Sequence, residues 1–168
     1  PFYKFGDAIY LAKIETKYWI EYICKRFENT GKHISPELAE EICRLVDNHS
    51  SYVQQLSWLL WIRTINTATT EQLSYALEDL LDQNNILFQS ETENLSAYQM
   101  NFLKAIVDGI HTKFSSKEVI SKYNLGTSAN IVRLKNALLQ KELIETNGKE
   151  IVLADPVFEV WFKKEMLY

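Results

Sequence analysis

The sequence predicts a mainly α-helical fold with one small β-hairpin near its C-terminal end. Apolar residues recur at the three- and four-residue spacing of amphipathic helices through most of the chain. Two short apolar runs, at 143–144 and 151–153, flank Asn147-Gly148, a dipeptide that favours a tight hairpin turn. The order helix, turn, helix, hairpin, helix over residues 114–161 is that of a winged helix-turn-helix domain. We therefore expect a helical bundle followed by a winged helix.

The first part of the chain carries signals for four helices. We expect them over residues 17–29, 36–48, 52–66 and from 70 toward 92. Ser35-Pro36-Glu37 starts the second with a capping serine, a proline in the first turn and an acid near the positive helix end. The third helix is apolar on every side, which predicts contacts in more than one direction. It is the expected centre of the bundle, with Trp58 and Trp61 buried.

The second part begins where Leu95-Ser96 restarts a helix that ends at Gly109. Ser115 or Ser116 caps a short helix over 117–122, which stops near Asn124-Leu125-Gly126. Thr127 or Ser128 caps the next helix, whose apolar positions at helical spacing are Ile131, Leu134 and Leu138. The hairpin and a last helix follow, and together these elements make the predicted winged helix.

The net charge of −4 conceals a difference between the two parts. Residues 1–94 carry 8 Lys or Arg and 14 Asp or Glu, a net charge of −6, whereas residues 95–168 carry 10 and 8, a net charge of +2. Between His111 and Lys141 six side chains are basic and Glu118 alone is acidic. This division indicates that any polyanionic partner meets the second part.

Motifs for catalysis are missing from the sequence. The five glycines are scattered, and the phosphate-loop pattern GxxxxGK[ST] cannot be written. His33, His49 and His111 lie far apart, without cysteines or carboxylates at metal-ligand spacing. We expect no catalytic residue, no metal site and no cofactor in this chain, and no enzyme activity by the chain alone.

Cysteine usage and hydropathy bear on the compartment. Cys24 and Cys43 lie in predicted helices without metal spacing, which favours buried thiols in a reducing compartment over a disulfide. No apolar run approaches the roughly 20 residues of a membrane helix, and no signal peptide is visible. We expect a cytoplasmic protein that does not enter a membrane. The chain begins at Pro1 rather than at methionine, so we expect a fragment of a longer protein.

Five stretches of the chain resemble a known family. They are PFYKFGD, NHSSYVQQLSWLLW, LSAYQMNFLKAI, SKYNLGTSANIVRLKNALLQKELIE and DPVFEVWFKK. Together they resemble the C-terminal half of the archaeal-type AAA+ ATPases, which are related to the STAND branch and to origin-recognition ATPases. The resemblance covers nearly the whole chain, and the last three stretches are its most specific part.

The resemblance implies two domains with different roles. Residues 1–93 would form the helical lid of the ATPase and residues 94–168 the winged helix behind it. The nucleotide-binding core would precede Pro1, and the parent protein would bind ATP and Mg there. This chain would then be the C-terminal regulatory fragment of an ATPase, and the missing core would be its first partner.

The resemblance also implies one position near the nucleotide. In such lids the turn before the third helix often reads glycine-any-proline, with the proline close to the adenine. Here the matching residues are Asn48-His49-Ser50, followed by Tyr52, so that Ser50 takes the proline position. The following helix start lacks the arginine that many lids use to sense phosphate. A polar turn in which Tyr52 packs locally is the alternative.

Three functions remain open for the winged helix. It could be coupled to a regulatory lid that moves as nucleotide is bound or hydrolysed. It could belong to a DNA-binding transcriptional regulator, with Ser128, Asn130, Arg133 and Asn136 facing a major groove. Lysines able to neutralise phosphates would then be Lys113, Lys117, Lys122 and, at the wing tip, Lys149. It could also be a pure protein-interaction module, because winged helices serve both kinds of partner.

Overall fold

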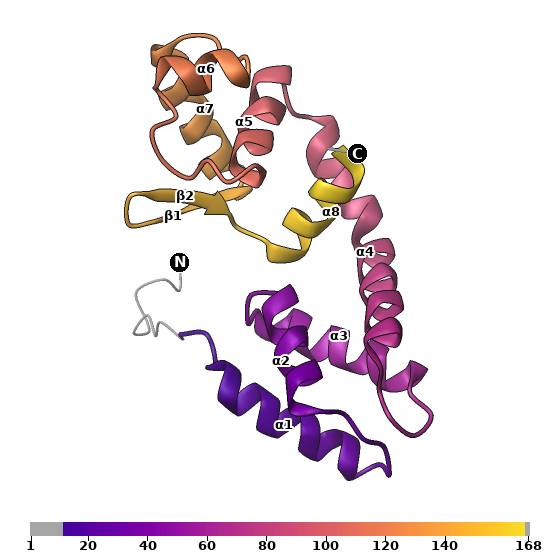
Figure 1. The fold of residues 1–168 in the computed structure, drawn as a ribbon. Helices are drawn as coiled ribbons and strands as arrows, with labels where there is room; N and C mark the ends of the chain where they lie inside the picture. Colours follow the sequence, from indigo (N-terminus) through magenta and orange to yellow (C-terminus); the bar gives the residue numbers. More distant parts are fainter. Residues whose placement is uncertain (1–11, 167–168) are drawn as a thin grey trace, which may run out of the picture. The chain divides into compact units, whose positions relative to one another are not determined.

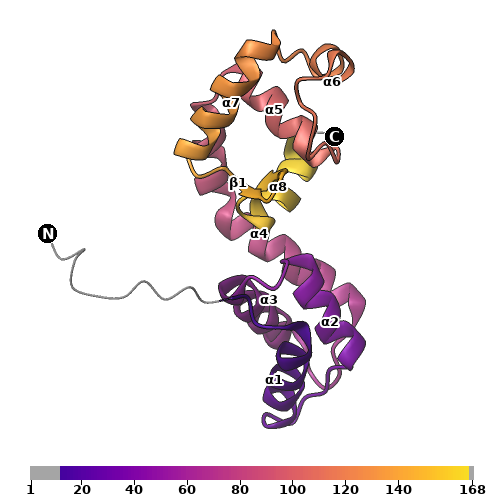
Figure 2. The same cartoon turned by 90° about the vertical axis from the view of Figure 1, so that its left-hand side faces the viewer.

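The computed structural model describes residues 12–166 and confirms the mainly α-helical fold class (Figures 1 and 2). Its eight helices and one two-stranded antiparallel sheet follow the expected order. The chain divides into two compact units, one reaching Ala76 and the other beginning at Leu77. The stretch PFYKFGD lies outside the described residues.

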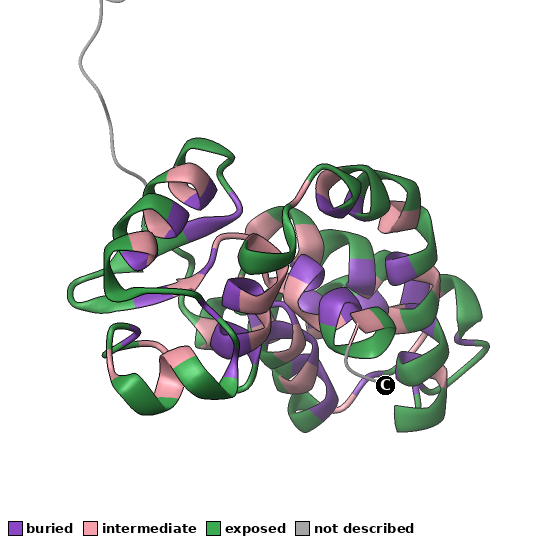
Figure 3. Ribbon diagram, turned by 90° about the horizontal axis from the view of Figure 1, so that it is seen from above, coloured by how far each residue is buried: buried purple, intermediate pink, exposed green. Residues whose placement is uncertain are grey.

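The first unit contains three helices and the beginning of a fourth. These are α1 (Thr16–Glu28), α2 (Pro36–Leu45), α3 (Ser50–Arg63) and the first turns of α4 (Thr70–Glu93). Helix α2 packs against both α1 and α3. The buried residues of this unit include Ile23, Phe27, Ile42, Leu56 and Leu60. Figure 3 colours the buried residues of the chain purple.

The capping residues explain where these helices begin. The Ser35 hydroxyl accepts a hydrogen bond from the Leu38 amide at 3.2 Å, and Pro36 follows as the first helical residue, as predicted. At the start of α4 the Thr69 hydroxyl accepts from the Gln72 amide, while the Gln72 side chain accepts from the Thr69 amide. This reciprocal pair satisfies two amides that the helix itself cannot bond.

The expectation that Trp58 and Trp61 are buried is wrong for Trp58, which is 57% exposed, and Trp61 is only half-buried. Helix α3 buries Val53, Leu56, Leu59 and Leu60 instead. The Trp61 indole Nε1 donates to the Thr30 hydroxyl at 2.8 Å, and the Lys32 ammonium lies 3.9 Å from the ring centroid. The two indoles therefore line an open apolar groove between α1 and α3, together with Tyr22 and Phe27.

The second unit contains the rest of α4, four further helices and the sheet. They are α5 (Ala97–Val107), α6 (Lys117–Lys122), α7 (Ser128–Gln140), β1 (Ile144–Asn147), β2 (Glu150–Leu153) and α8 (Pro156–Met166). Strands β1 and β2 pair antiparallel, with Ile144 opposite Leu153 and Asn147 opposite Glu150. Gly148 has a φ of +62°, which a residue without a side chain adopts easily in the two-residue turn.

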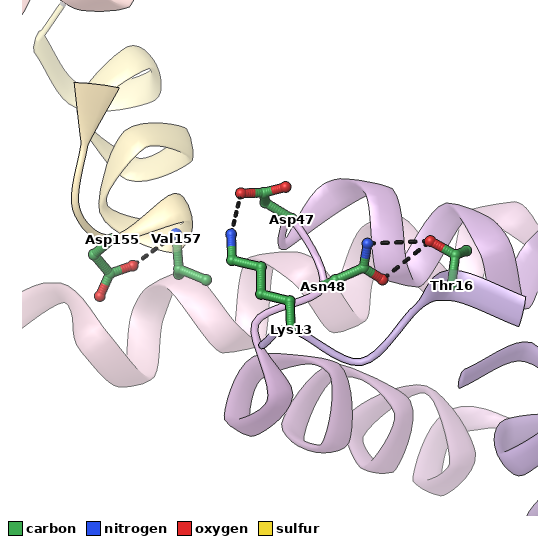
Figure 4. Close-up of polar contacts among 6 residues, drawn as sticks. All are labelled: Lys13, Thr16, Asp47, Asn48, Asp155 and Val157. Atoms are coloured by element: carbon green, nitrogen blue, oxygen red, sulfur yellow. Dashed lines mark hydrogen bonds and ion pairs between the residues drawn. The ribbon is translucent and has the colours of Figure 1, made fainter. Parts of the chain in front are cut away.

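An aromatic cluster forms the core where α8 meets α4. Trp161 is 2% exposed, and its ring centroid lies 5.6 Å from that of Phe88 and 5.7 Å from that of Phe158. The Trp161 indole Nε1 donates to the Asn85 side-chain oxygen at 2.8 Å. Asp155 caps α8 by accepting from the Val157 amide at 2.8 Å (Figure 4). These contacts attach the second half of α4 to the winged helix.

The division between the units differs from the expected one at residues 93 and 94. It falls inside α4, between Ala76 and Leu77. Phe88, in the second half of α4, packs with Phe158 of α8. Within the described residues, no helix is long and apolar enough to cross a membrane.

Candidate nucleic-acid interface

The turn before α7 fixes how that helix is presented. Gly126 has a φ of +85°, and a Cβ added to it would lie 3.2 Å from the Asn130 amide nitrogen and 3.4 Å from the Tyr98 ring. A side chain there would therefore meet both an unfavourable backbone and a crowded site. The Thr127 hydroxyl caps α7 by accepting from the Asn130 amide at 3.3 Å. The N-terminal end of α7 is thus held against the start of α5.

Helix α7 separates a buried face from an exposed one. Ile131, Leu134 and Leu138 are buried as predicted. The opposite face is exposed and consists of Ser128, Ala129, Val132, Arg133 and Asn136, so three of the four expected contact residues lie on it. Val132 is 62% exposed. A face of this kind, on the second helix of a helix-turn-helix, is available to a major groove.

Asn130 differs from the other three expected contact residues. Its side chain is half-buried, and the amide nitrogen donates to the Leu125 carbonyl at 2.9 Å. This hydrogen bond holds the turn that precedes α7. The structure therefore places Asn130 in the scaffold of the interface, beneath the exposed face.

Arg133 lies at one edge of that face. With Tyr98, Gly126, Thr127, Ala129 and Asn130 it lines a shallow hollow. The lining residues include no carboxylate, and they offer a guanidinium and the Thr127 and Tyr98 hydroxyls. Such groups are the ones that bind phosphate oxygens in protein–DNA complexes. Sequence reasoning missed Tyr98, because its partners on α7 are far from it along the chain.

The expected lysines lie on three different segments of the second unit. Lys113 in the loop before α6, and Lys117 and Lys122 on α6, are exposed. The Lys122 ammonium lies 4.8 Å from the Tyr123 ring centroid, and hydrogen bonding to Tyr123 raises the pKa of Lys122. The Lys122 ammonium therefore remains charged at neutral pH. Lys149 lies in the turn between the strands, beside Glu150.

The wing has an anchor that the sequence did not predict. The Ile151 amide donates to the His111 carbonyl at 2.9 Å, and His111 Nδ1 lies 3.2 Å from the Ile151 carbonyl oxygen. The loop after α5 therefore pairs with β2 and holds the hairpin. The sequence gives no sign of this role for His111, because pairing across such a distance leaves no local pattern.

The three residues expected near nucleotide lie at the start of α3. His49 precedes the helix, is exposed, and its ring centroid lies 4.7 Å from that of Tyr52. Ser50 is half-buried, and its carbonyl accepts from the Gln54 side chain. The local packing of Tyr52 matches the alternative of a polar turn.

The turn itself is tied to the start of α1 (Figure 4). Asp47 and Asn48 have φ values of +46° and +53°. The Asn48 side chain exchanges hydrogen bonds with the Thr16 hydroxyl at 3.1 and 3.2 Å, and Lys13 pairs with Asp47 at 2.5 Å. A neighbouring hollow is lined by Glu37, Glu40, Glu41, Asp47 and Arg44 among others. Its excess of carboxylates is unfavourable for phosphate.

Both cysteines are free thiols. Cys43 is fully buried, and burial raises the pKa of its thiol to about 11. Cys24 is half-buried, and burial raises its pKa as well. Both are therefore protonated and weakly nucleophilic at neutral pH. Among residues 12–166, no three His, Cys, Asp or Glu side chains are grouped so that they could hold a metal ion.

Comparison with known proteins gives a family match within the second unit. Residues 86–164 match the model of a family described as a probable winged helix domain. Among solved structures, a Walker-type ATPase of Pyrococcus abyssi is similar, with a TM-score of 0.68 and 18% sequence identity. The likeness covers 90% of this chain and 42% of that chain, so this chain spans less than half the length of its structural neighbour. At this identity the likeness shows the fold. No curated protein matches the chain.

Proposed function

We propose that the chain is the C-terminal regulatory part of an AAA+ family ATPase, in which a lid-like helical unit is coupled to a winged helix that contacts double-stranded DNA. The observation that carries the proposal is the likeness to a Walker-type ATPase over 90% of this chain, a share too large to fall within one unit. The unmatched part of that neighbour is long enough for a nucleotide-binding core. The parent protein would bind ATP and Mg in such a core.

In this proposal the first unit acts as the lid. The turn of His49 and Ser50, with Tyr52 behind it, would lie near the adenine, as the family resemblance implies. The acidic hollow beside the turn argues against direct phosphate sensing there, because carboxylates repel phosphate. The lid would respond to nucleotide by moving with the core rather than by binding the γ-phosphate itself.

DNA is the favoured partner because the second unit exposes polar side chains on α7 and cations on α7, on α6 and in the loop before α6. The exposed cations are Arg133 on α7, Lys113 in the loop before α6, and Lys117 and Lys122 on α6. Glu118 is the one acid in the sequence between Lys113 and Arg133. In protein–DNA complexes, cationic side chains bind the phosphates and polar side chains bind the edges of the bases. A transcriptional regulator without an ATPase core, or a pure protein-interaction module, would use the same face. A role with ATP and DNA makes the cytoplasm the proposed compartment.

The chain by itself should bind no nucleotide and hydrolyse no ATP, because its sequence contains no phosphate loop. Isothermal titration of the chain with Mg-ATP is the measurement. A clear isotherm with micromolar affinity would contradict the prediction and would move the nucleotide site into this chain.

Binding to duplex DNA should fall steeply as salt rises, because lysines displace counterions from phosphates. Lys117→Ala should lower the slope of log affinity against log salt by about one and weaken all duplexes alike. Arg133→Ala should cost about 1–3 kcal/mol if the guanidinium pairs with a guanine edge, and should relax sequence preference. Gel-shift titrations over a salt series, with random duplex and with an enriched duplex, measure both effects.

The matched control is Lys25→Ala, which removes one exposed cation from α1 in the first unit. It should leave both the affinity and the salt slope unchanged. Negligible binding by wild type and all variants at low salt would eliminate DNA contact and favour the protein-interaction module. Equal losses for Lys25→Ala and Lys117→Ala would mean that only net charge matters.

A further inference from the structure

Neither helix propensity nor packing in the core accounts for the apolar side chain of Val132. It is 62% exposed, whereas Ile131 and Leu134 on the same helix are 6% and 4% exposed. A β-branched residue also lowers helix propensity relative to alanine. Valine at this position therefore contributes little to folding, and its methyl groups remain available to a partner.

Ala129 is the apolar neighbour of Val132 on the surface of α7. Residues three and four positions from Val132 share its face: Ser128, Ala129 and Asn136 are exposed, and Lys135 is half-buried. Arg133 lies to one side, in the hollow with Tyr98. The exposed face of α7 thus holds the apolar pair Val132 and Ala129 next to the polar Ser128 and Asn136, and the cations Arg133 and Lys135 accompany them.

This arrangement corresponds to the chemistry of a major groove. Base edges lie at the floor of the groove and phosphates along its rims, so the centre of a recognition helix meets bases and its edges meet phosphates. Among the groups on the major-groove edges, the C5 methyl of thymine is the apolar one, and alanine or other methyl-bearing side chains contact it. A valine at the centre of the face suits that methyl group.

We propose that Val132, together with Ala129, packs against the C5 methyl of a thymine, and that this contact makes the winged helix select duplexes with thymine at one position. The inference rests on the proposed contact with DNA and goes further by naming what the centre of α7 reads. Asn130 takes no part in the selection, because its amide holds the Leu125 carbonyl.

The test begins with selection of bound duplexes from a pool with a random core, using the full 168-residue chain. Each thymine of the enriched duplex is then replaced in turn by deoxyuridine, which removes only the methyl group. For wild type, one replacement should weaken binding about fourfold, the value of one buried methyl group. Val132→Ala should discriminate between the thymine and uracil duplexes by well under the wild-type ratio, because only the smaller alanine side chains then face the methyl group. Gln140→Ala, a control at the exposed end of α7, should keep the wild-type ratio.

The possible failures differ from one another. If the pool yields no bound duplex, the proposed contact with DNA is wrong and this inference falls with it. If wild type binds an enriched duplex but no thymine-to-uracil replacement matters, only the inference is wrong. The inference is equally wrong if Val132→Ala retains the fourfold ratio. Circular dichroism confirms that Val132→Ala is folded, as expected for an exposed helical position.

Discussion

Trp161→Ala should lower the free energy of unfolding of the second unit by about 3–5 kcal/mol, the usual cost of deleting a large buried aromatic side chain. Trp161 is 2% exposed, and its ring packs with Phe88 and Phe158. The substitution also leaves the Asn85 side-chain oxygen without its indole donor. Chemical denaturation followed by far-ultraviolet circular dichroism measures the loss. Since whole domains are stable by only about 5–15 kcal/mol, this change is large.

Two further variants separate packing from hydrogen bonding. Trp161→Phe keeps an aromatic ring and removes the donor, so it should cost less than Trp161→Ala, with about 1–3 kcal/mol due to the unpaired oxygen. Lys163→Ala, on the exposed side of α8, removes only a surface ion pair with Glu159 and should cost less than about 1 kcal/mol. A stability of Trp161→Ala within about 1 kcal/mol of wild type, by the same denaturation, would contradict the packing described for α8.

Leu60→Ala and Trp58→Ala should have opposite outcomes although the two residues lie on the same helix. Leu60 is 0% exposed, and its truncation should destabilise the first unit by about 2–5 kcal/mol. Trp58 is 57% exposed, and its truncation should change the stability by about 0.5 kcal/mol or less. Thermal and denaturant unfolding of both variants provide the measurement. A large loss for Trp58→Ala would mean that the indole is covered in solution.

The difference between Leu60 and Trp58 shows where sequence reasoning about α3 failed. Apolar residues occupy every side of that helix, so periodicity could not indicate which side is buried. The choice depends on packing with neighbouring helices such as α2, which contacts α3, while Trp58 and Ile62 remain exposed. Where the pattern was one-sided, as for Ile131, Leu134 and Leu138 of α7, the buried face was predicted correctly.

The elements of the winged helix were predictable because their signals are local. Ser96, Ser116 and Thr127 cap their helices as expected, and the turn of the hairpin uses Gly148. The candidate site was less predictable, because it depends on contacts between distant residues. The approach of Tyr98 to Gly126 follows from the packing of α5 against α7. The division of the chain inside α4 has no signal in a continuous helical pattern either.

The pairing of His111 with Ile151 bears on the order in which the second unit folds. The two residues are separated by 40 positions, and the intervening chain contains α6, α7 and the first strand. Closing a loop of that length costs conformational entropy before any contact compensates for it. Helices α6 and α7, which depend on local contacts, can form earlier than this pairing. The wing should therefore be completed late in folding, after the helix that would enter the DNA groove is already in place.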